Sequence, residues 1–189
     1  MFVKICGITN RDDAMAAIKA GAGAIGFVFH KPSPRYASPE ALRAWIRDVP
    51  REIWKVGVFV NEAPAAIEEL RGDLGLDVAQ LHGNETPEQH PREIRLWKAF
   101  RGVMEAPREY PAEAVLLDGP GSGQTFEWSI AREFAGPVIV AGGLTPENVR
   151  AAVEATNPWG VDTATGVESS PGRKDHAKIE RFIKAALGK

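Results

Sequence analysis

The feature that most constrains the fold is a regular alternation of short apolar runs with helix-like segments. Each apolar run is short enough to be one strand, and strands that alternate with helices pair in parallel through right-handed crossovers. The predicted strands are "FVKIC" (2–6), "AIGFVF" (24–29), "KVGVFV" (55–60), "DVAQL" (77–81), "IRLWKAF" (94–100), "AVLLD" (114–118), "PVIVA" (137–141) and "GVDTA" (160–164). The pattern predicts an α/β protein with a parallel sheet.

The length of the repeat favours one parallel architecture over the others. Eight units in 189 residues leave about 24 residues for each strand, helix and pair of loops, which typical element lengths fill. We therefore expect residues 1–189 to form a single (β/α)₈ TIM barrel domain, although a lean one for that fold. The alternative is an open doubly wound sheet, which usually has about five or six strands.

Helix signals follow most of the predicted strands. The expected helices cover residues 10–21, 38–49, 63–75, 86–94, 125–136, 145–156 and 174–188. Asn10 is a good N-cap for the first of them, and Gly21 a good terminator. The segment 101–113 instead carries two prolines and no apolar stripe, so we expect the helix after the fifth strand to be reduced or missing.

Composition narrows the classes of partner. The formal net charge is −2, and no Lys/Arg run marks a nucleic-acid-binding patch. No apolar run approaches the roughly 18 residues of a membrane span, and the N-terminus does not resemble a signal peptide. The single cysteine, Cys6, cannot form an intramolecular disulfide. We expect a cytoplasmic protein that binds a small molecule and neither nucleic acid nor a membrane.

Candidate catalytic groups stand where strands end, which is where TIM barrels place their active sites. Cys6 ends the first strand and is either a small buried hydrophobe or an acid–base group. Lys4 shares its face, needs a partner such as Asp162 on the eighth strand, and would lower the thiol pKa. Asp118 ends the sixth strand, where partial loss of water favours a protonated general acid; alternatively it organises the turn.

Three further side chains and two loops are candidates for binding. Arg35, in the proline-stiffened "HKPSPRY", either faces a substrate carboxylate or is an ordinary surface arginine. Gln80 and His82 flank the end of the fourth strand, where hydrogen bonding within the barrel mouth is the alternative role. Gly142-Gly143, followed by Thr145 as the expected helix cap, and "VDTATGVESSPG" resemble phosphate-binding loops after strands seven and eight. No HxH, HExxH or CxxC spacing is present, so we expect no metal.

Taken in order, these segments resemble the phosphoribosylanthranilate isomerase family. The shared motifs are "KICGIT", "GFVFHKPSPRY", "VGVFVNE", "QLHGNE", "LLD" before "GSGQTFEW", "VAGGLTPENV" and "GVDTATGVESSPGRKD". The resemblance implies a TIM barrel that catalyses, without a cofactor, the Amadori rearrangement of N-(5-phosphoribosyl)anthranilate to 1-(o-carboxyphenylamino)-1-deoxyribulose 5-phosphate in tryptophan biosynthesis. It implies Cys6 as general base, Asp118 as general acid, Arg35 as the ligand of the anthranilate carboxylate, and Gly142, Gly143, Ala164 and Thr165 as phosphate-binding residues.

The sequence departs from the family where Thr163-Ala164-Thr165 replaces the common Val-Ser-Ser, so phosphate binding there depends on backbone N–H groups or on Thr165. The segment between Asp118 and "GSGQTF" is also short for the family. Two other functions stay open: a related sugar-phosphate isomerase or epimerase, and a non-catalytic phosphoribosyl-binding subunit. Both a monomer and a homodimer are compatible with the sequence.

Overall fold

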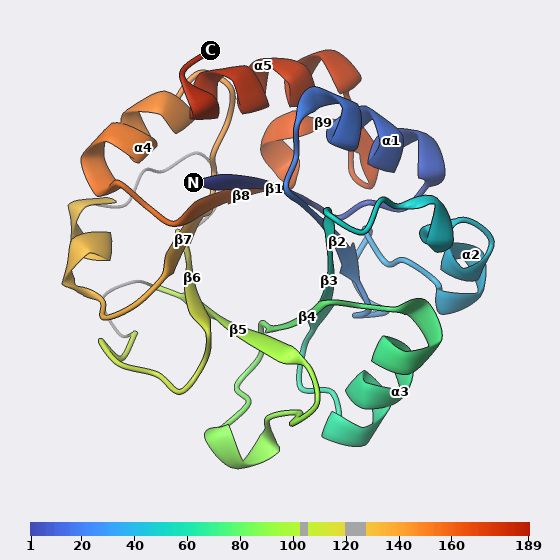
Figure 1. The fold of residues 1–189 in the computed structure, drawn as a ribbon. Helices are drawn as coiled ribbons and strands as arrows, with labels where there is room; N and C mark the ends of the chain where they lie inside the picture. The colour runs from blue at the N-terminus through green and yellow to red at the C-terminus, as the bar shows by residue number, and fades with distance from the viewer. Residues whose placement is uncertain (103–105, 120–127) are drawn as a thin grey trace.

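Eight parallel strands close into one barrel in the computed structural model, which describes residues 1–102, 106–119 and 128–189 (Figure 1). The strands are β1 (Phe2–Cys6), β2 (Ala24–Val28), β3 (Trp54–Phe59), β4 (Val78–Leu81), β5 (Arg95–Arg101), β6 (Ala114–Asp118), β7 (Val138–Ala141) and β8 (Gly160–Thr163). Each boundary lies within one residue of the predicted one. Lys4 of β1 pairs in register with Asp162 of β8, and this pairing closes the ring and excludes the open doubly wound sheet.

The helices surround the barrel on the outside (Figure 1). They are α1 (Arg11–Ala20), α2 (Pro39–Arg43), α3 (Pro64–Leu74), α4 (Val149–Thr156) and α5 (His176–Leu187). The Asn10 side chain accepts a hydrogen bond from the Asp13 N–H at 2.9 Å, and Gly21 ends α1 with a φ of 105°. These two residues confirm the predicted start and end of the first helix.

Several predicted helices are shorter than expected. The segment 86–94 contains only the 3₁₀ turn η2 (Pro87–Gln89), because His90 precedes Pro91 and is extended. The segment 38–49 divides into α2 and η1 (Ile46–Asp48), with Trp45 between them at a non-helical φ of −147°. As predicted, the described part of 101–113, which lacks 103–105, contains no helix.

The last two differences from the predicted helices lie in the segments that follow β6 and β7. The described part of 125–136 contains the 3₁₀ helix η4 (Trp128–Glu133). Residues 120–127, which include Pro120 and "GSGQTF", lie outside the described residues. Helix α4 begins at Val149 rather than at Thr145. The Asn148 side chain accepts from the Thr145 N–H at 2.7 Å and donates to the Gly143 carbonyl at 3.0 Å, which holds a turn before the helix.

The core has two apolar layers, and their packing leaves room for a functional site at one end of the barrel. One apolar layer packs between strands and helices, and the other fills the barrel interior. At the end where strands begin, Phe2, Trp54, Trp97 and Trp159 pack with ring centroids 4.8–5.9 Å apart. These rings fill the barrel there, so an open site is left at the end where the strands finish.

Two short elements extend the chain beyond the eighth strand. The 3₁₀ turn η5 (Thr165–Val167) leads into a two-stranded hairpin of β9 (Glu168–Ser170) and β10 (Arg173–Lys174).

No helix in the described ranges is both long enough and apolar enough to cross a membrane.

Candidate active site

A pocket of about 880 Å³ opens at the carboxyl end of the barrel, within the usual size range of small-molecule sites. All the residues selected from the sequence line this one pocket. They are Cys6, Arg35, Gln80, His82, Asp118, Gly142, Gly143, Ala164 and Thr165. They come from six different strand ends or the loops that follow them, separated in the sequence by as many as 159 residues. Barrel closure alone explains how such distant positions meet.

Cys6 lies at the pocket end of the barrel interior, above a buried ion pair. Its side chain is buried, and Lys4 Nζ donates to Asp162 Oδ2 at 2.9 Å, which confirms the predicted partner of Lys4. A Cβ at Gly26 of the adjacent strand would lie 2.8 Å from Cys6 Sγ and 3.0 Å from Lys4 Cε. The absence of a side chain at Gly26 is therefore what makes room for these two groups inside the barrel.

Two opposing effects act on the pKa of the Cys6 thiol. Burial raises the pKa of the Cys6 thiol above its ordinary value, and the positive charge of Lys4 offsets only part of this effect. Lys4 keeps a raised pKa despite its burial, because Asp162 and Cys6 favour its charged form. Lys4 lowers the thiol pKa as predicted, but burial, which the prediction did not include, outweighs this effect, so the pKa of Cys6 is raised overall.

Asp118 is held by a short hydrogen-bonded chain across the pocket mouth. Its Oδ2 lies 3.2 Å from His82 Nε2, and His82 Nδ1 lies 3.5 Å from Gln80 Nε2. An amide nitrogen only donates, so His82 Nδ1 accepts and its Nε2–H donates to the Asp118 carboxylate. Gln80 and His82 therefore do hydrogen-bond within the barrel mouth, and their contact orients Asp118. Arg101 Nε is a more distant neighbour at 4.0 Å.

Arg35 lies at the edge of the pocket with its guanidinium already bound to a carboxylate of the chain. Its Nε and Nη2 donate to the two oxygens of Glu168 at 2.8 and 2.7 Å. Arg35 is therefore fixed, which excludes the alternative of a solvated surface arginine. Sequence reasoning did not identify Glu168 as a partner, because the two residues are 133 positions apart and no local pattern connects them.

The two glycine-rich loops, after β7 and β8, form another part of the pocket lining. Gly142 and Gly143 have φ values of 82° and 68°, a conformation that favours glycine, and a Cβ at Gly142 would collide with the backbone of Gly119. In the loop after β8, Thr163 uses its hydroxyl to bond the Leu144 carbonyl at 2.8 Å. The Thr163 hydroxyl is therefore committed to joining the two loops, and Thr165 is the exposed hydroxyl at the pocket.

The donor set of this pocket suits acid–base chemistry on an anionic small molecule. A thiol and a carboxyl group line its walls, an arginine lies at one edge, and glycine turns with accessible backbone lie at another. In the part of the chain that the structure describes, no group of three or more His, Cys, Asp or Glu side chains is arranged to hold a metal ion.

Comparisons with known proteins agree with this arrangement. Residues 3–185 match the family model described as N-(5'phosphoribosyl)anthranilate (PRA) isomerase. The N-(5'-phosphoribosyl)anthranilate isomerase of Solibacter usitatus is 48% identical, and that of Geobacter sulfurreducens 47%, with alignments covering 100% and 98% of both proteins. The phosphoribosyl anthranilate isomerase crystal structure from Thermotoga maritima is 41% identical with a TM-score of 0.94, over 100% of both chains.

A second solved structure is of a phosphoribosyl anthranilate isomerase in complex with reduced 1-(o-carboxyphenylamino)-1-deoxyribulose 5-phosphate. It is 38% identical, with a TM-score of 0.88 over 100% of both chains. The motifs, the barrel and the full-length similarity lead to the same assignment. This chain belongs to the N-(5'-phosphoribosyl)anthranilate isomerase family.

Proposed function

We propose that Cys6 is the general base and Asp118 the general acid with which this chain isomerises N-(5-phosphoribosyl)anthranilate in tryptophan biosynthesis. The observation that supports these roles is that a thiol from β1 and a carboxyl group from β6 line one pocket. Positioned acids and bases each contribute about 10²–10⁴-fold to a rate. Binding and orientation of the substrate supply the rest.

Asp118 acts in the ring-opening step. The protonated carboxyl gives its proton to the furanose oxygen as the C1–O bond breaks, while the anthranilate nitrogen donates its electron pair and a Schiff base forms. The carboxylate left on Asp118 keeps the hydrogen bond from His82 Nε2, 3.2 Å away. That bond stabilises the anion produced by the step, so His82 and Gln80 assist without touching the transferred proton.

Cys6 acts in the second step. As a thiolate it removes the C2 proton, the C2–H electron pair becomes the C1=C2 bond, and the Schiff-base nitrogen recovers its electrons. The resulting enolamine takes a proton at C1 from solvent and gives its C2 hydroxyl proton to solvent, which produces the ketone. Solvent likewise takes the proton from Cys6 and returns one to Asp118. Because burial raises the thiol pKa, only the fraction of enzyme with ionised Cys6 is competent, and Lys4 limits the cost of forming that anion.

The two ends of the substrate are held by the groups on the pocket edges. Arg35 binds the anthranilate carboxylate, and backbone N–H groups at Gly142, Gly143, Ala164 and Thr165 bind the phosphate, with no metal or other cofactor. This places C1 and C2 over the barrel axis between Cys6 and Asp118. Thr165 takes the place of the hydroxyl that Ala164 lacks.

A substrate deuterated at C2 tests whether Cys6 and Asp118 act in different steps of the reaction. Breaking the C2–H bond becomes more rate-limiting when the base is weakened, so Cys6→Ser should show a larger isotope effect on kcat than wild type. Asp118→Asn slows ring opening instead, so its isotope effect should fall toward unity. An unchanged isotope effect in Cys6→Ser, or an enlarged one in Asp118→Asn, would overturn the assignment.

We also propose that residues 1–189 work as one barrel domain in the cytoplasm, as a monomer or a homodimer, without a nucleic-acid partner. The net charge of −2 and the unpaired Cys6 support this. The solved relative from Thermotoga maritima described as mutually generated monomers of a dimeric enzyme is 39% identical. Sedimentation equilibrium of the purified chain decides between the two assembly states.

A further inference from the structure

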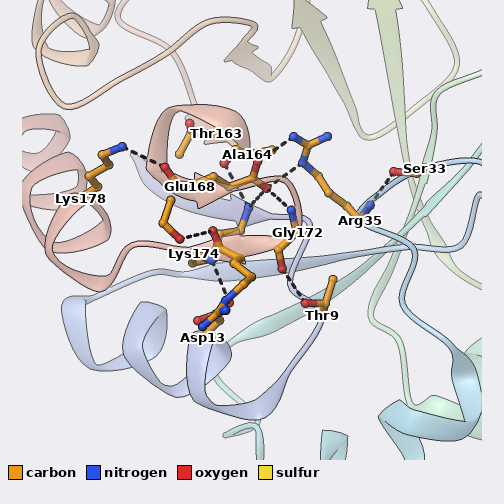
Figure 2. Close-up of polar contacts among 12 residues, drawn as sticks. Thr9, Asp13, Ser33, Arg35, Thr163, Ala164, Glu168, Gly172, Lys174 and Lys178 are labelled. Carbon is orange, nitrogen blue, oxygen red and sulfur yellow. Dashed lines mark hydrogen bonds and ion pairs between the residues drawn. The ribbon is translucent and has the colours of Figure 1, made fainter.

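Glu168 is a buried carboxylate that binds Arg35 from outside the pocket lining, and the chemistry above does not use it. It begins β9 and accepts two hydrogen bonds from Arg35, one at each carboxylate oxygen, at 2.8 and 2.7 Å (Figure 2). A two-bond contact of this kind fixes the plane of a guanidinium group as well as its position. The contact occupies the Nε–Nη2 edge of Arg35 and leaves its Nη1 end for a second carboxylate.

A buried lysine connects Glu168 to the loop after β8. The Lys174 side chain is 0% exposed, and its Nζ donates to Glu168 Oε1 at 2.9 Å and to the Ala164 carbonyl at 3.1 Å (Figure 2). A buried ammonium needs a counter-charge and full hydrogen bonding. Glu168 supplies the counter-charge and one hydrogen bond, and the Ala164 carbonyl accepts the other. Lys174 therefore joins the carboxylate that binds Arg35 to the backbone of the predicted phosphate-binding loop.

The backbone around Glu168 and Arg35 is packed closely enough to hold this geometry. A Cβ at Gly172, in the β9–β10 turn, would lie 2.8 Å from the Pro34 carbonyl oxygen, and Thr9 Oγ1 donates to the Gly172 carbonyl at 2.8 Å. A Cβ at Gly7 would lie 2.7 Å from Arg35 Cδ. The Arg35 side chain therefore packs against the backbone of Gly7, directly after Cys6, and also contacts Glu168 in the hairpin.

The charges within this cluster favour an ionised Glu168. Burial alone would raise the pKa of Glu168, but the hydrogen bonds from Arg35 and the charge of Lys174 together lower it. Burial lowers the pKa of Lys174, an effect that Glu168 opposes. A neutral residue at position 168 would therefore leave two cations facing each other at the pocket edge.

We propose that Glu168 is a positioning residue for substrate recognition. Glu168 holds Arg35 so that the free Nη1 end of the guanidinium meets the anthranilate carboxylate. Lys174 fixes the distance between this contact and the phosphate-binding loop. This inference rests on the proposed role of Arg35. It assigns to Glu168 a role in selecting substrates by their carboxylate, with no contact between Glu168 and the substrate.

The test compares two substrates in one set of variants. N-(5-Phosphoribosyl)anthranilate carries the carboxylate, and N-(5-phosphoribosyl)aniline lacks it. Glu168→Gln should lower kcat/KM for the anthranilate substrate by about 10- to 100-fold, mostly through KM, because a charge-assisted contact is misaligned. The same variant should change kcat/KM for the aniline substrate by less than about twofold, since that substrate never uses Arg35.

Thr9→Val is the matched structural control. It removes one hydrogen bond that anchors the same hairpin, at Gly172, without altering the carboxylate. Any effect of a loosened hairpin should appear equally for both substrates. Equal losses for both substrates in Glu168→Gln would show that Glu168 is only structural and would overturn the inference, as would a gain in kcat/KM for the anthranilate substrate.

Arg35→Gln separates this inference from the assignment on which it depends. A loss confined to the anthranilate substrate supports the role of Arg35, and the Glu168 result then decides the positioning role alone. Equal losses for both substrates contradict Arg35 as the carboxylate ligand and overturn both. If Glu168→Gln does not fold, the double variant Glu168→Gln/Lys174→Met removes the uncompensated lysine. Because it also removes the link to Ala164, kcat/KM should fall for both substrates but several-fold more for the anthranilate substrate, and equal losses would overturn the inference.

Discussion

Lys4→Met is the substitution whose cost can be worked out most fully from the structure. Lys4 is 0% exposed inside the barrel and pairs with Asp162, whose side chain is only 9% exposed, at 2.9 Å. Methionine fills much of the same volume but leaves Asp162 without its counter-charge. Among the described residues, Asp162 Oδ1 already has no hydrogen-bond partner, so the carboxylate would lose the interaction that compensates its burial.

The expected loss of stability is that of breaking one buried ion pair, about 3–5 kcal/mol. For a chain of this size each kcal/mol moves Tm by roughly 2–4 °C, so Tm should fall by roughly 6–20 °C. Urea unfolding followed by tryptophan fluorescence gives the free energy of unfolding, because Trp54, Trp97 and Trp159 lie together in the barrel. Calorimetry gives Tm.

Two further variants show whether the buried charge is the cause. Lys4→Met/Asp162→Leu removes both charges and should recover much of the lost stability. Arg43→Met breaks an exposed pair with Asp73, with N and O 2.7 Å apart, and should leave the unfolding midpoint unchanged. The reasoning is refuted if Lys4→Met is as stable as Arg43→Met, or if the double variant is less stable than the single one.

Three other expectations follow from the site. Since the pKa of Cys6 is raised, a pH profile of kcat/KM should keep rising above neutral pH as the thiol ionises; a flat profile from pH 6 to 9 argues against a thiolate base. Gly142→Ala should raise KM for the phosphorylated substrate at least about tenfold, because the new Cβ meets the Gly119 backbone; an unchanged KM would remove this loop from phosphate binding. The folded pKa of Glu168 lies below its ordinary 4.5, so its stabilising contribution is present above about pH 4.5 and lost as pH falls through the folded value; urea midpoints measured from pH 7 to 3 should show this decline, and a midpoint constant between pH 5 and 3 would contradict it.

The barrel was predictable because each strand carries its own local signal. Runs such as "KVGVFV" and "AVLLD" are apolar, short and bounded by turn residues, and the eightfold repeat determines how they combine. The helix at 86–94 was overpredicted because the effect of Pro91 on His90 outweighs the helical signal of "TPEQ". Helix α4 starts late because the Asn148 side chain forms a turn that Thr145 and Pro146 do not reveal.

The site residues were predictable from motifs, but their electrostatics were not. The ionisation of Cys6 depends on a balance between burial and the charge of Lys4, and sequence supplies the cation without the burial. The contact between Arg35 and Glu168 joins loops that follow the second and eighth strands, which only the closed ring brings together. Long-range polar contacts of this kind have no local sequence signature.

The most direct test of the central claim is the turnover of N-(5-phosphoribosyl)anthranilate by Cys6→Ser and Asp118→Asn, measured beside wild type. Circular dichroism and urea unfolding must first show that both variants are folded. The proposed roles predict that each substitution lowers kcat by at least about 10²-fold. Turnover within about twofold of wild type in either variant would contradict the assignment of that residue as a catalytic acid or base.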